Sequence, residues 1–196
     1  ILNYGSLANF TPSSFVITSG AAGGLTYTFA DTSSAITLAI TGTLAVNSTW
    51  TPTTGGSWTS PATNWTGSNV PNGAGATGNF GSSITGASTV TLDGNKTVGI
   101  LNFNNANVYT IATGSGGKLI MNNGLSVANL TDNSVPGNPA LAGQVIAADV
   151  TLDSETLVTV VGGEKFAING VIDGANGLSK AGSGVLALGA ANTYAG

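Results

Sequence analysis

Short apolar runs separated by tight turns are the feature of this sequence that most constrains its fold. Runs of three to five residues, such as 109–111, 119–121 and 166–168, alternate with Asn-Gly and Asp-Gly pairs. Period-two alternation of this kind is typical of β-strands, and no stretch has the i, i+3, i+4, i+7 spacing of an amphipathic helix. Asn-Gly turns also occur in plain hairpins. Because the runs are so short, the pattern favours a coil of stacked parallel strands within an all-β fold.

One internal echo supports a repeated coil. Val90 to Asp93 has the sequence VTLD, and Val150 to Asp153 repeats it. Repeats of this kind are expected from stacked structural units. The echo predicts that Asp93 and Asp153 lie on one side of the coil.

The chain divides into three segments by composition. Residues 1–45 contain runs at 15–18, 25–29 and 35–41, which predict a small antiparallel β unit, with 1–4 as a further strand. Residues 46–88 hold all three Trp and many Pro and Gly, which predicts a junction or cap. Residues 89–196 hold the repeated runs and predict the solenoid.

The last residues carry a specific motif. The sequence NGLSKAGSGVLALGAANTYAG, from Asn176 to Gly196, resembles the autotransporter-associated β-strand repeat, whose pattern is G-L-x-K-x-G-x-G-x-L-x-L-x-G-x-N-T-Y-x-G. The Trp-rich stretch from Trp50 to Asp93 is similar to the opening of repeat modules in large secreted proteins that carry these repeats. The resemblance implies a right-handed parallel β-helix exported to the bacterial cell surface, without catalytic residues. The family pattern continues beyond the final Gly, so we expect a fragment of a longer chain or an open last coil completed by another copy.

The composition excludes several functions. The chain has no His, Cys or Arg, and only four Lys and eight acidic residues. Nucleophilic sites with an imidazole base, His/Cys zinc sites and disulfides are therefore excluded. Four cationic side chains and a formal charge of −4 argue against nucleic-acid binding. No apolar run is long enough for a membrane-spanning helix. Only 6% of the residues are charged, against about a quarter in typical globular domains, which favours an extracellular or cell-surface location.

The carboxylates offer a weak catalytic or metal-binding pattern. Asp93, Asp149, Asp153 and Glu155 are the clustered acids. A glycosidase needs two facing acids, but each residue is better explained as support for a turn. Asp93-Gly94-Asn95 and the turn after Asp173 offer oxygens for Ca²⁺, but neither has EF-hand spacing. We expect no catalytic residue, no metal and no cofactor.

The three Trp residues have two interpretations. Trp50, Trp58 and Trp65 could stack on sugar rings, or they could cap one end of the coil, which otherwise exposes an apolar cross-section. We favour capping.

The expected function is structural. An unfinished last coil is a template for strand addition, so the sequence predicts a filament subunit, stalk or adhesin segment that associates end to end. The contact is expected near Ile1, Leu2 and Tyr4 of one copy and Leu186, Leu188 and Tyr194 of the next. The alternative is a carbohydrate-binding or polysaccharide-degrading β-helix, with a surface polysaccharide as partner. A passenger segment awaiting a membrane barrel is a third interpretation.

Overall fold

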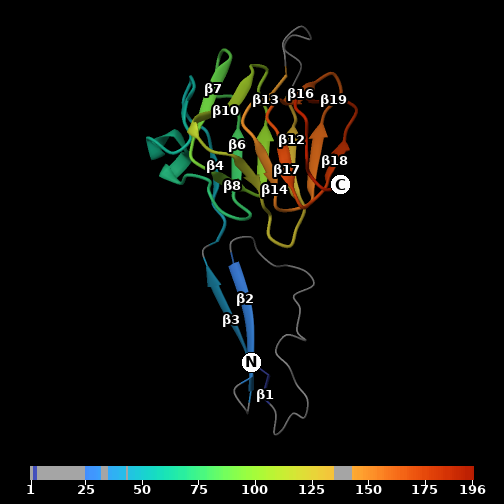
Figure 1. Cartoon of the computed structure of the whole chain (residues 1–196). Helices are drawn as coiled ribbons and strands as arrows, with labels where there is room; N and C mark the ends of the chain where they lie inside the picture. Colours follow the sequence, from blue (N-terminus) through green and yellow to red (C-terminus); the bar gives the residue numbers. More distant parts are fainter. Residues whose placement is uncertain (1, 4–24, 32–34, 43, 135–142) are drawn as a thin grey trace.

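The computed structural model describes residues 2–3, 25–31, 35–42, 44–134 and 143–196 (Figure 1). The chain is mostly β, with one antiparallel sheet and three parallel sheets. The expectation of an all-β fold with parallel sheets is therefore confirmed. Within the described residues, no helix is long and apolar enough to cross a bilayer.

The N-terminal strands form a separate hairpin sheet. Strands β2 and β3 pair antiparallel, and the short β1 adds to the other edge of β3, so that β2 is an edge strand. Figure 1 shows this hairpin standing clear of the rest of the chain. The bounds are β1 Leu2–Asn3, β2 Leu25–Asp31 and β3 Ala35–Gly42.

The remaining strands form three parallel sheets, which we call the three-sheet body. Sheet I contains β4 Asn47–Thr49, β6 Thr77–Phe80, β9 Ile100–Phe103, β12 Ala128–Asp132, β15 Thr156–Val160 and β18 Leu178–Ala181. Sheet II contains β5 Gly56–Ser57, β7 Ser88–Asp93, β10 Tyr109–Gly116, β13 Val145–Ile146, β16 Lys165–Ile168 and β19 Val185–Leu188. Sheet III contains β8 Lys96–Val98, β11 Leu119–Met121, β14 Val150–Leu152 and β17 Ile172–Gly174.

The chain visits the three sheets in a fixed order. After β7 in sheet II it enters β8 in sheet III and β9 in sheet I, and it then returns to sheet II as β10, paired parallel with β7. The same order recurs through β11 to β13 and through β14 to β16. Each circuit therefore adds one strand to the growing edge of every sheet. In Figure 1 the labelled strands of sheet I accordingly follow one another in chain order, from β4 through β6 and β12 to β18.

The core lies between the sheets and is built from inward-facing columns. Residues at equivalent positions of neighbouring strands stack directly, as Phe80 does on Phe103, with ring centroids 5.0 Å apart and planes 12° from parallel. In sheet III, Leu119, Val150 and Ile172 form another such column. These side chains are buried, whereas the alternate residues along each strand, such as Ile120 and Thr151, are partly exposed. The strict alternation in the sequence thus determines which face of each strand is buried.

Side chains at the corners tie each circuit to the next. Asn95 Oδ1 accepts a hydrogen bond from the backbone N–H of Lys118, 23 residues later, at 3.0 Å. Asp149 Oδ1 accepts one from the N–H of Val171, 22 residues later, at 2.9 Å. Asp149, which was expected to support a turn, therefore joins the corners of two neighbouring circuits. Polar residues at these positions provide backbone partners where the ladder hydrogen bonds end.

Two expectations from the sequence need correction. The parallel sheets begin at Asn47, not at residue 89, because β4, β5 and β6 already pair with the strands that follow. The VTLD echo is not a structural repeat, since Val90 pairs with Ile111 in sheet II whereas Val150 pairs with Leu119 in sheet III. Asp93 and Asp153 therefore do not occupy equivalent positions, and the prediction that the repeat places them on one side of the coil is wrong.

The hairpin agrees with part of the expectation for residues 1–45. Strands β2 and β3 cover the expected runs at 25–29 and 35–41 and are antiparallel. The expected run at 15–18 lies outside the described residues, as do Ile1 and Tyr4.

Candidate functional site: the two ends of the three-sheet body

The first end of the body is covered by a cluster of aromatic rings. Trp50, Trp58 and Trp65 are each at most 1% exposed. The ring centroids of Trp58 and Trp65 lie 4.8 Å apart, and Trp65 lies 5.5 Å from Phe80, which continues the stack into the core. Clusters of this kind bury a large apolar area and gain further from edge-to-face geometry. We call this the closed end.

Two of the three indole N–H groups of the closed end are paired. Trp58 Nε1 donates to the carbonyl of Pro71 at 2.8 Å, and Trp65 Nε1 donates to the carbonyl of Trp58 at 2.7 Å. Trp50 Nε1 is buried without a hydrogen-bond partner. Because all three indoles are buried, they form no exposed platform, and the interpretation as a sugar-stacking surface is wrong.

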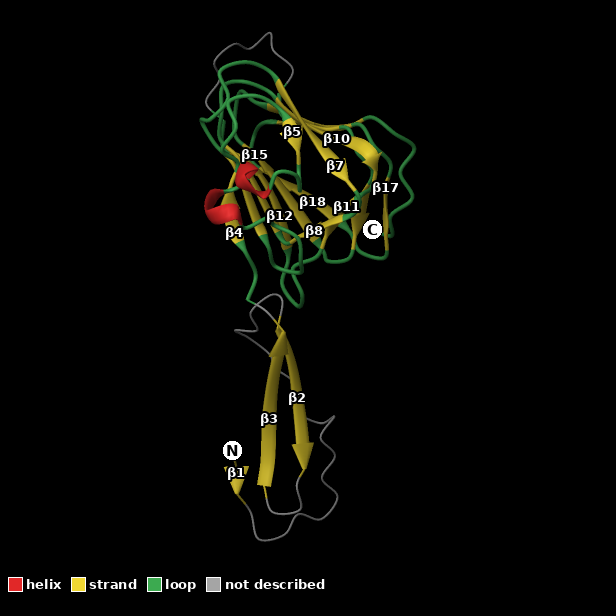
Figure 2. Cartoon of the chain, turned by 90° about the vertical axis from the view of Figure 1, so that its left-hand side faces the viewer, coloured by secondary structure: helices red, strands yellow, loops and turns green. Residues whose placement is uncertain are grey.

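The outer edges of the first strands are also occupied. The short helical segments Ala62–Asn64 and Thr66–Ser68 lie beside β4 (Figure 2). Thr66 Oγ1 accepts from the N–H of Thr49 at 3.0 Å, and Asn64 Nδ2 donates to the carbonyl of Ser57 in β5 at 2.9 Å. In sheet III, Asn72 Oδ1 accepts from the N–H of Thr97 at 2.9 Å. A further strand has few free backbone groups to pair with at this end.

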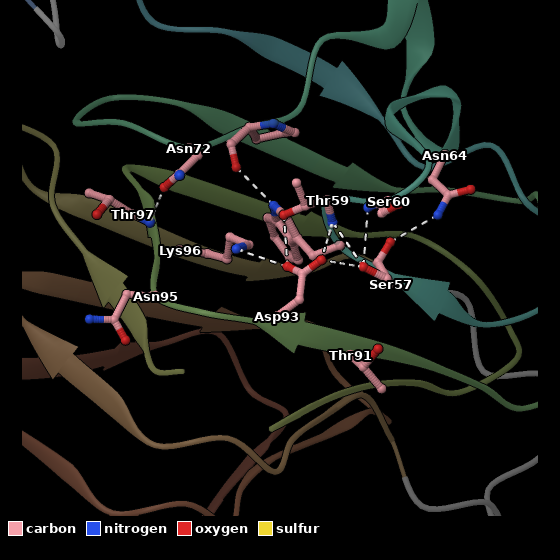
Figure 3. Close-up of polar contacts among 12 residues, drawn as sticks. Ser57, Thr59, Ser60, Asn64, Asn72, Thr91, Asp93, Asn95, Lys96 and Thr97 are labelled. Carbon is pink, nitrogen blue, oxygen red and sulfur yellow. Dashed lines mark hydrogen bonds and ion pairs between the residues drawn. The ribbon is translucent and has the colours of Figure 1, made fainter. Parts of the chain in front are cut away.

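A charged pair lies at one corner of the closed end. Lys96 faces inward from β8 and is only 5% exposed, and its Nζ lies 2.9 Å from Asp93 Oδ1. Figure 3 shows Ser57, Thr59 and Lys96 converging on the Asp93 carboxylate. Thr59 Oγ1 donates to Oδ1 at 2.7 Å, and the hydroxyl of Ser57 donates to Oδ2.

These contacts determine the charge state of Asp93. Burial by itself would raise the pKa of the carboxyl, but the hydrogen bonds from Ser57, Thr59 and Lys96 together lower it well below its usual range. The carboxylate is therefore ionised and neutralises the buried ammonium of Lys96. Among the described residues, no group of three or more Asp and Glu is arranged to hold a metal ion.

The opposite end of the body is open in two of its three sheets. β18 and β19 each pair with a strand on one side, and neither has a strand on the other side among the described residues. The N–H of Val185 points back to the carbonyl of Glu164, and that of Gly189 to Ile168. Since N–H groups alternate in direction along a strand, those of Leu186 and Leu188 face the free side. We call this the open end.

The third sheet is continued by the final residues. The N–H of Thr193 donates to the carbonyl of Ile172 at 2.9 Å, and that of Ala195 donates to Gly174 at 3.0 Å. Asn192 Oδ1 accepts from the N–H of Ile172 at 2.9 Å. The NTY segment of the motif therefore runs along the outer edge of β17.

The expected contact residues divide between the two parts of the chain. Leu186 and Tyr194 are partly buried against the core at the open end, and Leu188 there is 39% exposed. Leu2 is in β1 of the hairpin, where it pairs with Ile36. The structure thus places Leu186, Leu188 and Tyr194 at the open end, the first two in β19 and Tyr194 in the segment along β17, while Leu2 belongs to the separate hairpin.

Two further candidate acids, Glu155 and Asp173, have structural partners. Glu155 Oε2 accepts from the N–H of Gly177 at 3.2 Å. Glu155 also borders a shallow pocket of about 220 Å³, with Val127, Thr156, Leu157 and Ser179 as the other lining residues. No second carboxylate lines this pocket, so it does not provide the facing acids of a glycosidase. Asp173 is held by Lys118 Nζ at 2.5 Å and by Thr151 Oγ1 at 2.6 Å.

One buried acid was missed in the sequence. Asp132 is fully buried in sheet I, in the column between Phe103 and Val160, and its Oδ2 has no hydrogen-bond partner. Burial raises the pKa of this carboxyl, against a hydrogen bond from the N–H of Ser134 to Oδ1 at 3.0 Å. The alternation with Ala128 and Leu130 places Asp132 on the inward face, and that signal was available from the sequence.

No family model, curated protein or solved structure matches this chain. The resemblance of the C-terminal motif to the autotransporter-associated repeat therefore stays a prediction. Its described residues form a parallel three-sheet body with one closed end and one open end.

Proposed function

We propose that this chain is a structural module of an extracellular bacterial surface protein, folded as a right-handed β-solenoid, that assembles end to end through its open end. The fixed order in which the chain visits the three sheets is the arrangement expected of such a coil. The low charge content of the sequence and the C-terminal motif support an exported module.

The single observation that carries the assembly proposal is the pair of free strand edges at β18 and β19. Such edges present unpaired N–H and C=O groups, which pair readily with another strand. Apolar side chains lie beside them, since Val185 is 57% exposed and Leu188 is 39% exposed. Edge and apolar surface together favour β-strand addition over a purely polar contact.

The difference between the two ends restricts the mode of assembly. At the closed end, Thr66, Asn64 and Asn72 already occupy groups along the first strands. Direct stacking of the open end on the closed end of another body would displace these contacts. The strand that pairs with the open end therefore comes from a part of the next copy other than its closed end.

The test compares two substitutions at one position. Leu188→Pro removes the outward N–H and so blocks strand addition, whereas Leu188→Ala shortens the same side chain and keeps the N–H. The N–H of Leu188 faces the free side, so neither variant loses a ladder hydrogen bond of the body. We expect light scattering to show concentration-dependent assembly for the parent chain and for Leu188→Ala, and monomers for Leu188→Pro.

Electron microscopy of the same samples supplies the second readout. The proposal expects elongated particles from the parent chain and single short particles from Leu188→Pro. A parent chain that stays monomeric at high concentration would contradict the proposal.

A further inference from the structure

Two acidic side chains lie at the corner between sheets I and II, next to the open end. Asp132 is the last residue of β12 and is fully buried, and its Oδ2 has no hydrogen-bond partner. Glu164 lies between β15 and β16 and is half-buried. Burial raises the pKa of both carboxyls, and the charge of Asp132 raises the pKa of Glu164 further. The corner therefore holds two carboxyls that are costly to ionise together.

The nearest neighbours of the buried carboxyl are uncharged. In the register of sheet I, Asp132 lies between Phe103 and Val160. Ser134 donates its N–H to Oδ1 of Asp132, and its Oγ accepts from Gln144 Nε2 at 3.1 Å. None of these groups neutralises a carboxylate, and an ionised carboxyl without a partner is unfavourable in the interior.

Three other ionisable side chains come from the elements packed around Asp132: Tyr109, Glu164 and Lys165. Lys165 is exposed, faces outward from β16 and is in neither of the ion pairs that the described residues form. The phenol of Tyr109 is hydrogen-bonded to Ser83, and burial raises its pKa further above neutral pH. Glu164 is therefore the neighbour whose charge changes together with that of Asp132.

The turn that carries Glu164 supports the start of β19, the edge strand of sheet II at the open end. The N–H of Val185 donates to the carbonyl of Glu164 at 2.9 Å. Gly184 packs so closely against this turn that a Cβ there would overlap the carbonyl oxygen of Val161. The N–H of Val161 donates in turn to the carbonyl of Asp132 at 3.1 Å. Continuous backbone contacts thus connect the two acids with the free edge beside β16 (Figure 1).

We propose that Asp132 and Glu164 form a pH switch that regulates strand addition at the open end; this regulation rests on the end-to-end assembly proposed above. When both carboxyls are neutral, the turn stays closed against Gly184 and β19 is held in place from its first residue. When both are ionised, an opened turn in which the carboxylates reach water is favoured, and the start of β19 loses its support. A strand edge that is already ordered is the better template for strand addition. Assembly is therefore stronger in acid than at neutral pH.

Linkage gives the sign and the scale of the effect. A carboxyl with a raised pKa stabilises the closed turn fully below its ordinary value, which is 3.8 for Asp132 and 4.5 for Glu164. This stabilisation is lost as the pH rises through the raised value. Each unit by which the pKa is raised makes opening about tenfold more favourable at neutral pH.

Hydrogen exchange tests the switch at protein concentrations too low for assembly. From about pH 4 to about pH 7, the N–H groups of Val161 and Val185 should lose at least about tenfold in protection, after correction for the intrinsic exchange rate. The N–H of Thr193, which donates to Ile172 on the other side of the body, is the control and should lose much less. Unchanged protection at the first two amides, or an equal loss at all three, would overturn the proposal.

Substitutions assign the loss of protection to the two acids. Asp132→Asn and Glu164→Gln each remove one titrating carboxyl, so each should reduce the pH dependence of exchange at Val161 and Val185. Asp153→Asn removes an exposed carboxyl and should leave that dependence as it is in the parent chain. The same result for Asp132→Asn and Asp153→Asn would contradict the switch.

Light scattering at neutral pH connects the switch with assembly. Asp132→Asn should assemble at a several-fold lower concentration than the parent chain, whereas Asp153→Asn, which makes the same change in net charge, should assemble like the parent. If the parent assembles and the two variants behave alike, the regulation is wrong while end-to-end assembly stands. If the parent assembles neither in acid nor at neutral pH, the proposed function is wrong, and the regulation with it.

Discussion

The Nζ of Lys96 lies 2.9 Å from Oδ1 of Asp93, at the corner where the first strand of sheet III begins. The lysine is almost fully buried, whereas the carboxylate that neutralises its charge is partly exposed at the surface. This relationship explains why a charged residue is tolerated on the inward face of a terminal strand.

The first prediction concerns this pair. Asp93→Asn leaves the ammonium of Lys96 buried without a carboxylate, and we expect a loss of about 1–3 kcal/mol in the free energy of unfolding. Urea denaturation at neutral pH measures it. Lys118 and Asp173 form a more exposed pair, so Asp173→Asn is the control and should leave the midpoint almost unchanged. Equal losses in the two variants would contradict the prediction.

The same pair predicts a pH dependence. The pKa of Asp93 is lowered in the folded chain from an ordinary value of 3.8. Its contribution to stability is therefore fully present above about pH 4 and is lost as the pH falls below that value. We expect the unfolding midpoint of the parent chain to fall more steeply than that of Asp93→Asn on acidification below this pH. Parallel curves for the two proteins would show that the carboxylate is not stabilised.

The second prediction uses the indole N–H groups of the closed end. Trp65→Phe and Trp58→Phe each remove a donor to a carbonyl, whereas the N–H of Trp50 has no partner to lose. All three replacements delete a similar part of a buried ring. We expect Trp65→Phe and Trp58→Phe to cost about 1–3 kcal/mol more than Trp50→Phe, because each leaves an acceptor unpaired. Denaturation curves of the three variants provide the comparison, and an equal loss in all three would refute it.

The third prediction concerns Asp132. Its pKa is raised, so its contribution to stability is present at low pH and is lost as the pH rises through the raised value. Asp132→Asn keeps an acceptor for the N–H of Ser134 and has no carboxyl group to ionise, so at pH 7 it should raise the free energy of unfolding by about 1–3 kcal/mol.

The pH dependence of this gain is the control on its cause. We expect the gain from Asp132→Asn to diminish toward pH 3, where the parent carboxyl is neutral. Asp153→Asn is a matched change at an exposed acid and should have little effect at either pH. A gain that is the same at both pH values would contradict the role of charge.

The sequence predicted the strands well because alternation is a local signal. Leu101 and Phe103 in β9, and Val158 and Val160 in β15, face inward as their period-two spacing requires. It was harder to predict which strands belong to the same sheet, because this depends on the number of residues between one strand of a sheet and the next. In sheet III the paired residues Lys96 and Leu119 are 23 positions apart in the sequence, whereas Leu119 and its next partner Val150 are 31 positions apart. The VTLD echo misled for this reason, since similar strands occur in different sheets.

The closed end was predicted in kind but not in extent. Three Trp among Pro and Gly indicated a packed segment, and the structure buries all three. Nothing in the sequence indicated that Ser57 would contact Asp93 at the end of β7, because that contact joins residues 36 positions apart. Lys180 likewise looked like an ordinary motif residue, and only the register with Val158 shows that it faces the interior.

The unlike ends also give any assembled stack a direction. One terminus of the stack would always present the Trp-covered closed end, and the other would always present the free strand edges of the open end. Growth and attachment would then be separate properties of opposite termini. An anchor recognising the closed end would fix the orientation of every later subunit, and a single blocking strand at the far terminus would be enough to set the length.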